Sequence, residues 1–233
     1  MQLILDSIYK SFGQKQVLWG AAYTFKKGNI YGLLGRNGAG KTTLFNCLSG
    51  EFPPDEGTAL LQNGGRSRPL QEGDVGYVLS TPVVPDFLTG YEFVRFFLDI
   101  SRSTNAPERT ADQWLDLVQI DKDDRHRLMK DYSHGMKNKI QMLCFLIARP
   151  PVILLDEPLT SFDVVAALEM KKLLREMKRE HIIIFSTHIL QLAADLCDEI
   201  VVLNHGVLES VDASAIHTPQ FEARIIEILK DEE

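Results

Sequence analysis

The chain has 233 residues, a formal net charge of −7, and 45% hydrophobic and 24% charged residues. The acidic balance argues against a nucleic-acid surface, which needs basic side chains to neutralise phosphates. No apolar stretch approaches the roughly 20 residues that cross a bilayer, and no signal peptide is recognised at the start. Cys47, Cys144 and Cys197 lack metal-ligand spacing, which indicates reduced thiols. We therefore expect a soluble cytoplasmic α/β protein.

A phosphate-binding loop is the most informative motif. Residues 35–42 read Gly-Arg-Asn-Gly-Ala-Gly-Lys-Thr, which matches the pattern Gly, four residues, Gly-Lys-Thr. The apolar residues 30–34 predict a buried strand before the loop, and residues 41–48 predict a helix after it. In this context backbone N–H groups would surround phosphates, Lys41 would reach the β- and γ-phosphates, and Thr42 would offer its hydroxyl to Mg²⁺. The alternative is a glycine-rich turn with an exposed lysine.

Two carboxylates follow a second apolar stretch. Residues 152–155 predict a buried strand that leads directly into Asp156 and Glu157. Ligands bind at the C-terminal ends of strands in open α/β sheets, so both acids are expected near the phosphates. Asp156 would hold Mg²⁺ through its water shell, and Glu157 would act as general base for an attacking water. Taken alone, this motif could also be a strand end capped by solvated acids.

The rest of the chain predicts further strands and helices around these motifs. Strands are expected at 3–5, 17–18, 22–25, 58–62, 75–79, 182–186 and 200–203, and helices at 93–100, 114–118, 137–147, 164–179, 189–197 and 221–229.

Three expectations concern side-chain burial. The helix at 164–179 carries an apolar core stripe at Ala167, Met170, Leu174 and Met177. In an inserted helical region at 82–145, Phe93, Phe96 and Phe97 are expected to be mostly core. The charged residues 121–130 are expected to form a solvated face.

In this order the elements resemble the ATP-binding cassette of ABC transporters over nearly the whole chain. Residues 35–42 are similar to the Walker A loop, 152–157 to the Walker B strand, and 160–163, with Asp163, to the D-loop. Tyr132-Ser133-His134-Gly135-Met136 keeps Ser133 and Gly135 of the Leu-Ser-Gly-Gly-Gln signature, and the match leans toward bacterial exporters. A lone histidine at a strand end is more often structural, but His188 falls at the position of the family's switch histidine. Phe12 falls where the family stacks an aromatic ring on adenine, and an ordinary edge-strand aromatic is its alternative.

The resemblance implies a mixed α/β P-loop NTPase core with an N-terminal antiparallel β part. Residues 1–233 would form a single ABC ATPase domain with a helical subdomain inserted at 82–145. ATP and Mg²⁺ would be the cofactors, with catalytic roles for Lys41, Glu157 and His188 and metal binding by Thr42 and Asp156. The implied nucleotide-binding residues are Phe12, Gly35, Arg36, Asn37, Gly38, Ala39, Gly40, Lys41, Thr42, Thr43, Ser133 and Gly135.

The resemblance also implies partners. Hydrolysis would power a separate integral membrane subunit at the inner face of the cell membrane, contacted through the Ser80–Glu92 region and the helical subdomain. Two ATPase subunits would close head to tail, so that Ser133 and Gly135 of one chain cap the γ-phosphate bound by the other.

One departure from the family leaves alternatives open. The family carries a glutamine where this chain has Ser80, whose side chain is shorter by two heavy atoms. This departure and the altered signature keep open a nucleotide-binding regulator that does not hydrolyse ATP. A soluble cassette ATPase outside transport is a second alternative. A GTPase or small-molecule kinase is disfavoured because Asn138-Lys139-Ile140-Gln141 lacks the aspartate of a guanine-binding motif.

Overall fold

A computed structural model describes residues 1–79, 81–101, 109–158 and 164–211, together with positions 218, 221, 223, 225, 227 and 228. The chain forms two compact units. The core unit comprises Met1–Tyr77, Pro151–Glu157 and Lys171–Glu233, and the helical unit comprises Val78–Pro150 and Pro158–Met170. Within the described residues, no helix combines the length and apolarity needed to span a bilayer.

The core unit begins with a four-stranded antiparallel sheet. Its strands β1 (Gln2–Phe12), β2 (Lys15–Lys26), β4 (Glu56–Asn63) and β5 (Arg66–Pro69) lie in the order β2-β1-β4-β5. The short strands expected before residue 30 are therefore parts of one long hairpin, and β5 was not expected. Gly13, with φ +61°, turns β1 into β2, so the register pairs Phe12 with Lys15.

A second, six-stranded sheet lies in the order β10-β9-β3-β8-β7-β6. Its strands are β3 (Ile30–Leu34), β6 (Val75–Val78), β7 (Val152–Asp156), β8 (Ile182–Thr187), β9 (Glu199–Asn204) and β10 (Val207–Val211). β3 pairs in parallel with β8 and β9, and β7 pairs in parallel with β8, whereas β10 is antiparallel to β9. The mixed α/β fold class is confirmed, with β10 as an additional strand.

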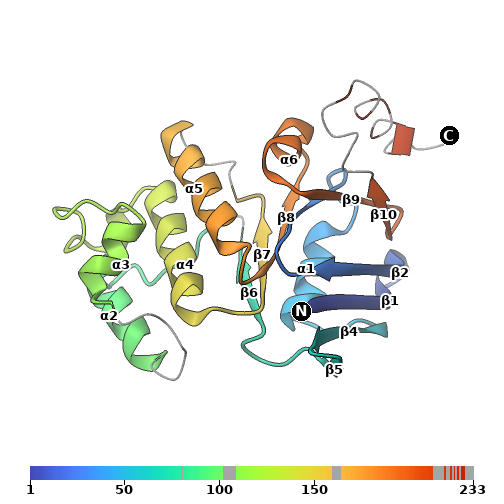
Figure 1. Cartoon of the computed structure of the whole chain (residues 1–233), viewed down its shortest axis with the longest axis horizontal. Helices are drawn as coiled ribbons and strands as arrows, with labels where there is room; N and C mark the ends of the chain where they lie inside the picture. The colour runs from blue at the N-terminus through green and yellow to red at the C-terminus, as the bar shows by residue number, and fades with distance from the viewer. Residues whose placement is uncertain are drawn as a thin grey trace. The chain divides into compact units, whose positions relative to one another are not determined.

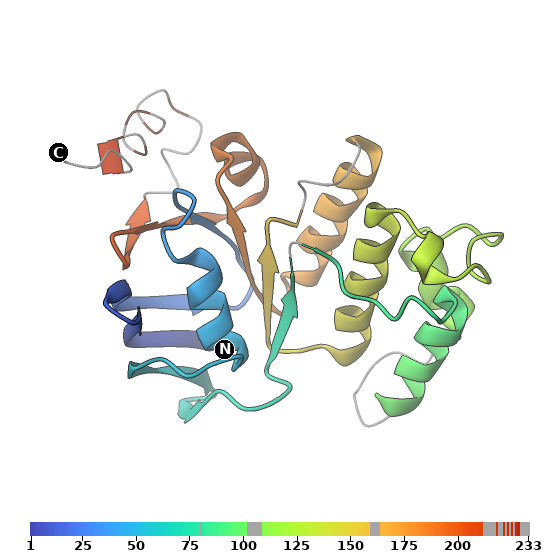
Figure 2. The same ribbon diagram turned by 180° about the vertical axis from the view of Figure 1, so that it is seen from behind.

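Helix α1 (Lys41–Ser49) lies between the two sheets (Figures 1 and 2). Leu44, Phe45 and Leu48 are buried in one cluster with Leu3 of β1 and Leu154 of β7. Burying a large apolar side chain contributes about 1.5–3 kcal/mol. This packing fixes the start of α1, where the phosphate-binding loop ends, against both sheets.

The helices that follow β7 also keep their apolar patterns. In α5 (Val164–Met177), Met170, Leu174 and Met177 are buried and Ala167 is half-buried, so the predicted stripe is confirmed. α6 (Leu190–Leu196) follows β8. The described positions of the helix expected at 221–229 are helical, and Phe221 and Ile225 are buried.

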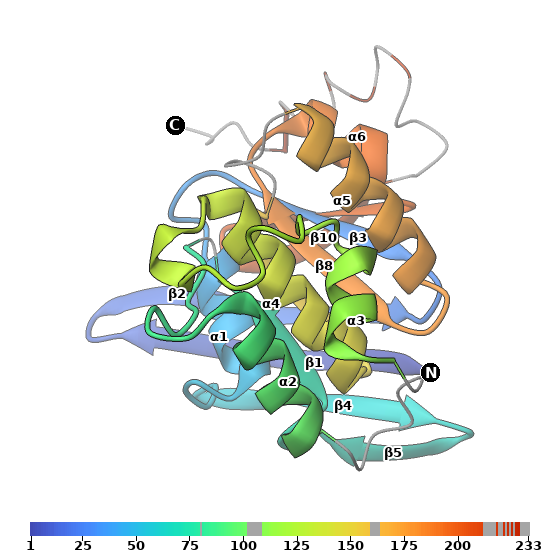
Figure 3. The same ribbon diagram turned by 90° about the vertical axis from the view of Figure 1, so that its left-hand side faces the viewer.

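Helices α2 (Gly90–Ile100), α3 (Ala111–Leu117) and α4 (His134–Ala148) make up most of the helical unit, with a short 3₁₀ turn at Met129–Asp131. α2 packs against α3 and α4 (Figure 3). Its start is fixed by a capping box, in which Thr89 and Glu92 satisfy each other's backbone N–H groups.

Two burial expectations in the helical unit are wrong. Phe96 is 54% exposed, while Phe93 and Phe97 are only half-buried, because α2 turns Val94 inward instead. Within the charged residues 121–130, Arg125 is buried. Its guanidinium bonds to Asp112 at 2.9 Å, to Asp116, and to the carbonyl oxygen of Ile120, and these partners compensate its desolvation.

The three cysteines are free and half-buried. Burial raises the pKa of Cys47 to about 11 and that of Cys144 to about 12, and it raises the pKa of Cys197. All three are therefore protonated and weakly reactive at neutral pH.

Candidate functional site: a phosphate-binding loop beside two carboxylates

The phosphate-binding loop connects the buried strand β3 to α1, as the sequence predicts. Gly35 must be glycine because an added Cβ would lie 2.7 Å from the carbonyl oxygen of Leu203. Gly40 has φ +106°, and a Cβ there would approach Val17 to 2.9 Å. Gly40 is also the N-cap of α1, so the loop ends at the positive end of the helix dipole.

Lys41 points its ammonium group back into the loop. It is 7% exposed, and Nζ donates to the carbonyl oxygens of Gly35 at 2.7 Å and Arg36 at 3.1 Å. Burial lowers the pKa of Lys41, and the nearby carboxylates of Glu157 and Asp156 raise it and partly offset that effect. The exposed lysine of the alternative interpretation is therefore excluded.

Asp156 lies at the C-terminal end of β7 and accepts three hydroxyl hydrogen bonds. Its Oδ2 accepts from Thr42 Oγ1 at 2.9 Å and from the Tyr77 hydroxyl at 3.3 Å, and its Oδ1 accepts from Ser186. Burial and the charge of Asp156 raise the pKa of Tyr77, so the phenol remains a donor. These bonds join β6, β7, β8 and α1 around one buried carboxylate.

Glu157 turns away from the strand. Its φ of +49° is unusual for a residue with a side chain, and its backbone N–H donates to Ser186 Oγ at 3.1 Å. Its Oε1 lies 2.8 Å from Nδ1 of His188, which follows β8. The structure thus brings His188 and Glu157 together beside Asp156, although both side chains remain partly exposed.

Lys41, Asp156 and Glu157 line a cavity of about 340 Å³. Phe12 reaches it from the end of β1, is 50% exposed, and packs edge-on against Phe52 with 5.6 Å between ring centroids. The lining residues are Phe12, Lys15, Val17, Asn37, Gly38, Gly40, Lys41, Thr42, Thr43, Asp156 and Glu157. All of them belong to the core unit.

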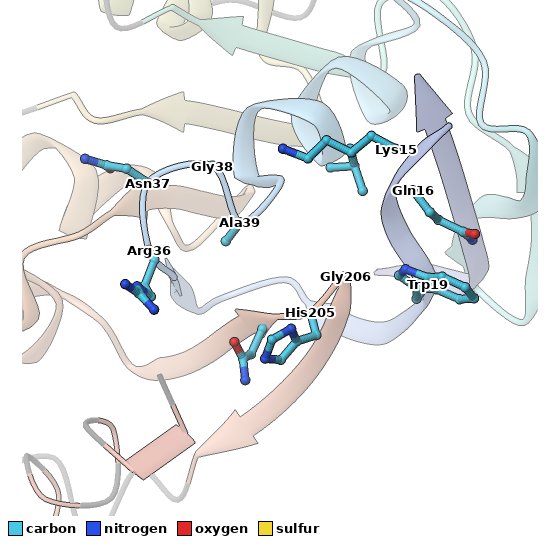
Figure 4. A pocket seen from close by; sticks show the side chains of 11 residues that line it. Lys15, Gln16, Trp19, Arg36, Asn37, Gly38, Ala39, His205 and Gly206 are labelled. Atoms are coloured by element: carbon cyan, nitrogen blue, oxygen red, sulfur yellow. The ribbon is translucent and has the colours of Figure 1, made fainter. Parts of the chain in front are cut away.

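A second cavity of about 320 Å³ lies along the same loop (Figure 4). Residues 36–39 line it together with residues 204–206, Lys15 and Trp19, and four residues line both cavities: Lys15, Val17, Asn37 and Gly38. Of the predicted loop residues, Arg36 and Ala39 therefore face this second cavity.

The predicted signature residues belong to the helical unit. Ser133 is the N-cap of α4, and its Oγ accepts from the backbone N–H of Met136 at 3.2 Å. Gly135 lies in the first turn of α4, where an added Cβ would lie 3.8 Å from Ser133 Oγ, an ordinary van der Waals contact. Ser80 and the D-loop segment 160–163 lie outside the described residues.

Sequence analysis did not identify Tyr77, Ser186 and Lys15 as part of the site. Ser186 was included only as the end of an apolar strand, and Tyr77 only as part of another. The available signal was a hydroxyl at the C-terminal end of each of these strands, where parallel strands present ligands.

The donor set fits Mg²⁺. Thr42 and Asp156 offer hard oxygen atoms within 2.9 Å of each other beside the phosphate-binding loop. The described residues contain no cluster of three metal-ligating side chains that would form an all-protein cage. Mg²⁺ characteristically binds through one or two protein oxygens together with substrate phosphates and waters.

Comparison with known proteins places the chain in a family. The ABC transporter profile matches residues 18–160. A sulfate/thiosulfate import ATP-binding protein, CysA of Mesostigma viride, is 33% identical over 215 residues, covering 91% of this chain and 62% of that protein. The chain thus spans less than two thirds of the length of that relative.

Solved structures agree at the level of the fold. An ATP-binding subunit of an ABC transporter superposes with a TM-score of 0.83 at 23% identity, covering 99% of this chain and 100% of that one. The ATP-binding cassette MJ0796, in a dimeric post-hydrolysis state bound to ADP and Pi, gives 0.76 at 18% identity and covers 91% and 98%. From its motifs, their geometry and these matches, the chain belongs to the ABC transporter family.

Proposed function

We propose that this chain is the ATP-hydrolysing subunit of an ABC transporter, with residues 1–233 forming one cassette. The observation that carries the proposal is the convergence of Lys41, Asp156 and Glu157 on one cavity beside the phosphate-binding loop. A loop that only bound phosphate would not need a carboxylate held beside the γ-phosphate position.

ATP would lie along the cavity with its adenine on Phe12. The backbone of residues 35–43 and the ammonium of Lys41 would bind the phosphates. Thr42 and Asp156 would hold Mg²⁺, which when bound neutralises charge on the β- and γ-phosphates. The hydrogen bond between Thr42 and Asp156 supports this assignment, because it places both oxygens at one point.

Glu157 would take a proton from the attacking water. Its contact with His188 supports the role, because the imidazole can orient the carboxylate. Lys41 would stabilise the charge that develops on the phosphate oxygens during transfer.

A second copy, or a homologous chain, would complete the site. We infer that Ser133 and Gly135 act in trans on the γ-phosphate, as the family resemblance implies. The exposed N-terminus of α4, where Ser133 caps only one N–H group, offers further donors to an anion.

A membrane subunit would be the other partner, and the protein would then work at the cytoplasmic face of the membrane. The helical unit supports this inference, since four of its large exposed apolar side chains gather in or just before α2: Val83, Phe87, Phe96 and Ile100. The direction of transport is a separate prediction, and the signature sequence favours export.

Glu157→Gln tests the proposal. The amide cannot accept the proton, so phosphate release should fall on the order of 10²–10⁴-fold while Mg-ATP still binds. Exposed Glu56→Gln on β4 serves as the matched control and should behave as wild type. Near-normal turnover in Glu157→Gln would refute the general-base role. Absence of turnover in the wild-type dimer would favour the non-hydrolysing regulator.

A further inference from the structure

The C-terminal end of β8 carries a fully buried hydroxyl. Ser186 is 0% exposed and follows Ile182–Phe185, all of which are buried apolar residues. A hydroxyl in such a place destabilises the fold unless it finds hydrogen-bond partners. Alanine would fill a similar volume without this penalty, so the serine calls for an explanation beyond packing.

Both hydrogen bonds of this hydroxyl go to the proposed reaction site. Ser186 Oγ donates to Asp156 Oδ1 and accepts from the backbone N–H of Glu157 at 3.1 Å. Ser186 and Asp156 are register partners on neighbouring parallel strands, so the sheet itself fixes their approach. One side chain therefore contacts both acidic residues.

The contact with Glu157 also supports an unfavourable backbone conformation. Residues with a Cβ rarely adopt the left-handed conformation, and Glu157 has φ +49°. In this conformation the N–H group turns to Ser186 Oγ. The same turn directs the carboxylate to His188.

We propose that Ser186 is a positioning residue that orients both acidic residues at once. By donating to Oδ1 of Asp156, it leaves Oδ2 facing Thr42 and the cation position. By accepting from Glu157, it fixes the turn that aims the proposed general base. The inference rests on the proposed function, but it assigns a role to a residue outside the family motifs described above.

Ser186→Ala tests the inference, with phosphate release, ATP affinity and Mn²⁺ affinity as separate readouts. Loss of a residue that orients site ligands typically costs about 10–100-fold, so kcat should fall by that amount. The Kd for ATP should stay within about threefold, because Lys41 and the loop are untouched. The affinity of the ATP complex for Mn²⁺, followed by electron paramagnetic resonance, should weaken about fivefold with the loss of one hydrogen bond.

Thr187→Val is the matched control. Thr187 is equally buried on β8, but its hydroxyl accepts from the backbone N–H of Ile189 and touches neither acid. Ser186→Cys, of similar volume and with a weaker donor, should give an intermediate kcat, and it decides the question if the alanine variant does not fold.

Two results would overturn the inference. One is a folded Ser186→Ala or Ser186→Cys protein with wild-type kcat and Mn²⁺ affinity. The other is an equal loss in Thr187→Val, which would indicate general damage to β8. The Mn²⁺ measurement needs no turnover, so it tests Ser186 even if wild-type protein fails to hydrolyse ATP, which would refute the proposed function alone.

Discussion

Replacing Lys41 by alanine separates phosphate binding from folding. The Lys41 ammonium is buried, and its two hydrogen bonds end on carbonyl oxygens of its own loop, Gly35 O and Arg36 O. When nucleotide binds, the same ammonium would donate hydrogen bonds to the phosphate oxygens. The substitution would remove the ammonium that we assign to the phosphates and leave the backbone donors of the loop in place.

The expected loss of affinity follows from the energy of a hydrogen bond to a charged group. Such a bond contributes about 1.5–3 kcal/mol net. At about 1.4 kcal/mol per tenfold change, the Kd for Mg-ATP should rise on the order of 10–150-fold. The fold should survive, because burial already disfavours the charged amine, which compensates part of the cost of leaving two carbonyls without a donor.

Isothermal titration with Mg-ATP measures the affinity, and circular dichroism measures the thermal unfolding midpoint. Lys27→Ala, in the exposed turn between β2 and β3, is the control and should bind as wild type. A Kd within threefold of wild type would refute the assignment of Lys41 to the phosphates. Unfolding of the variant at 25 °C would show that its contacts with the loop carbonyls are structural.

Three further predictions concern the partners and the rate of hydrolysis. Mixing Ser133→Arg chains with Lys41→Ala chains should restore phosphate release above either variant alone, because one site of each mixed dimer is intact; no gain would contradict the trans assignment or require both sites. Ser80→Gln should raise basal phosphate release, since it restores the glutamine that the family resemblance implies for positioning the attacking water, and an equal or lower rate would contradict this account. Phe96→Asp and Phe87→Asp should change the unfolding free energy by no more than about 0.5 kcal/mol, yet abolish co-purification with the membrane subunit; retained co-purification would exclude this surface.

Local sequence patterns predicted the frame of the fold. The strands at β3 and β7 are uninterrupted apolar runs that end at the phosphate-binding loop and at Asp156. Parallel strands buried on both faces read this way, and their C-terminal ends share one edge of a sheet. The convergence of Lys41, Asp156 and Glu157 could therefore be expected before any coordinates were known.

Features that depend on distant partners were not predictable in the same way. Arg125 lies in a run of charges typical of a solvated surface, and only the fold brings Asp112 and Asp116 to its guanidinium. Phe96 lies on an apolar helix face too wide to be buried completely, so periodicity alone could not separate its core side from its exposed side.

The hydroxyl groups around Asp156 are a further feature that the sequence alone could not predict. Tyr77 and Ser186 lie 79 and 30 positions from Asp156 in the sequence, and each reaches it only through the strand register. A shift of one residue in β8 would turn Ser186 to the opposite face of the sheet and replace it with Phe185 or Thr187. Neither motif resemblance nor hydrophobic pattern specifies that register. The sequence does show an unusual serine near the end of an apolar strand. The fold explains it, because that position faces the carboxylate of Asp156 on the neighbouring strand.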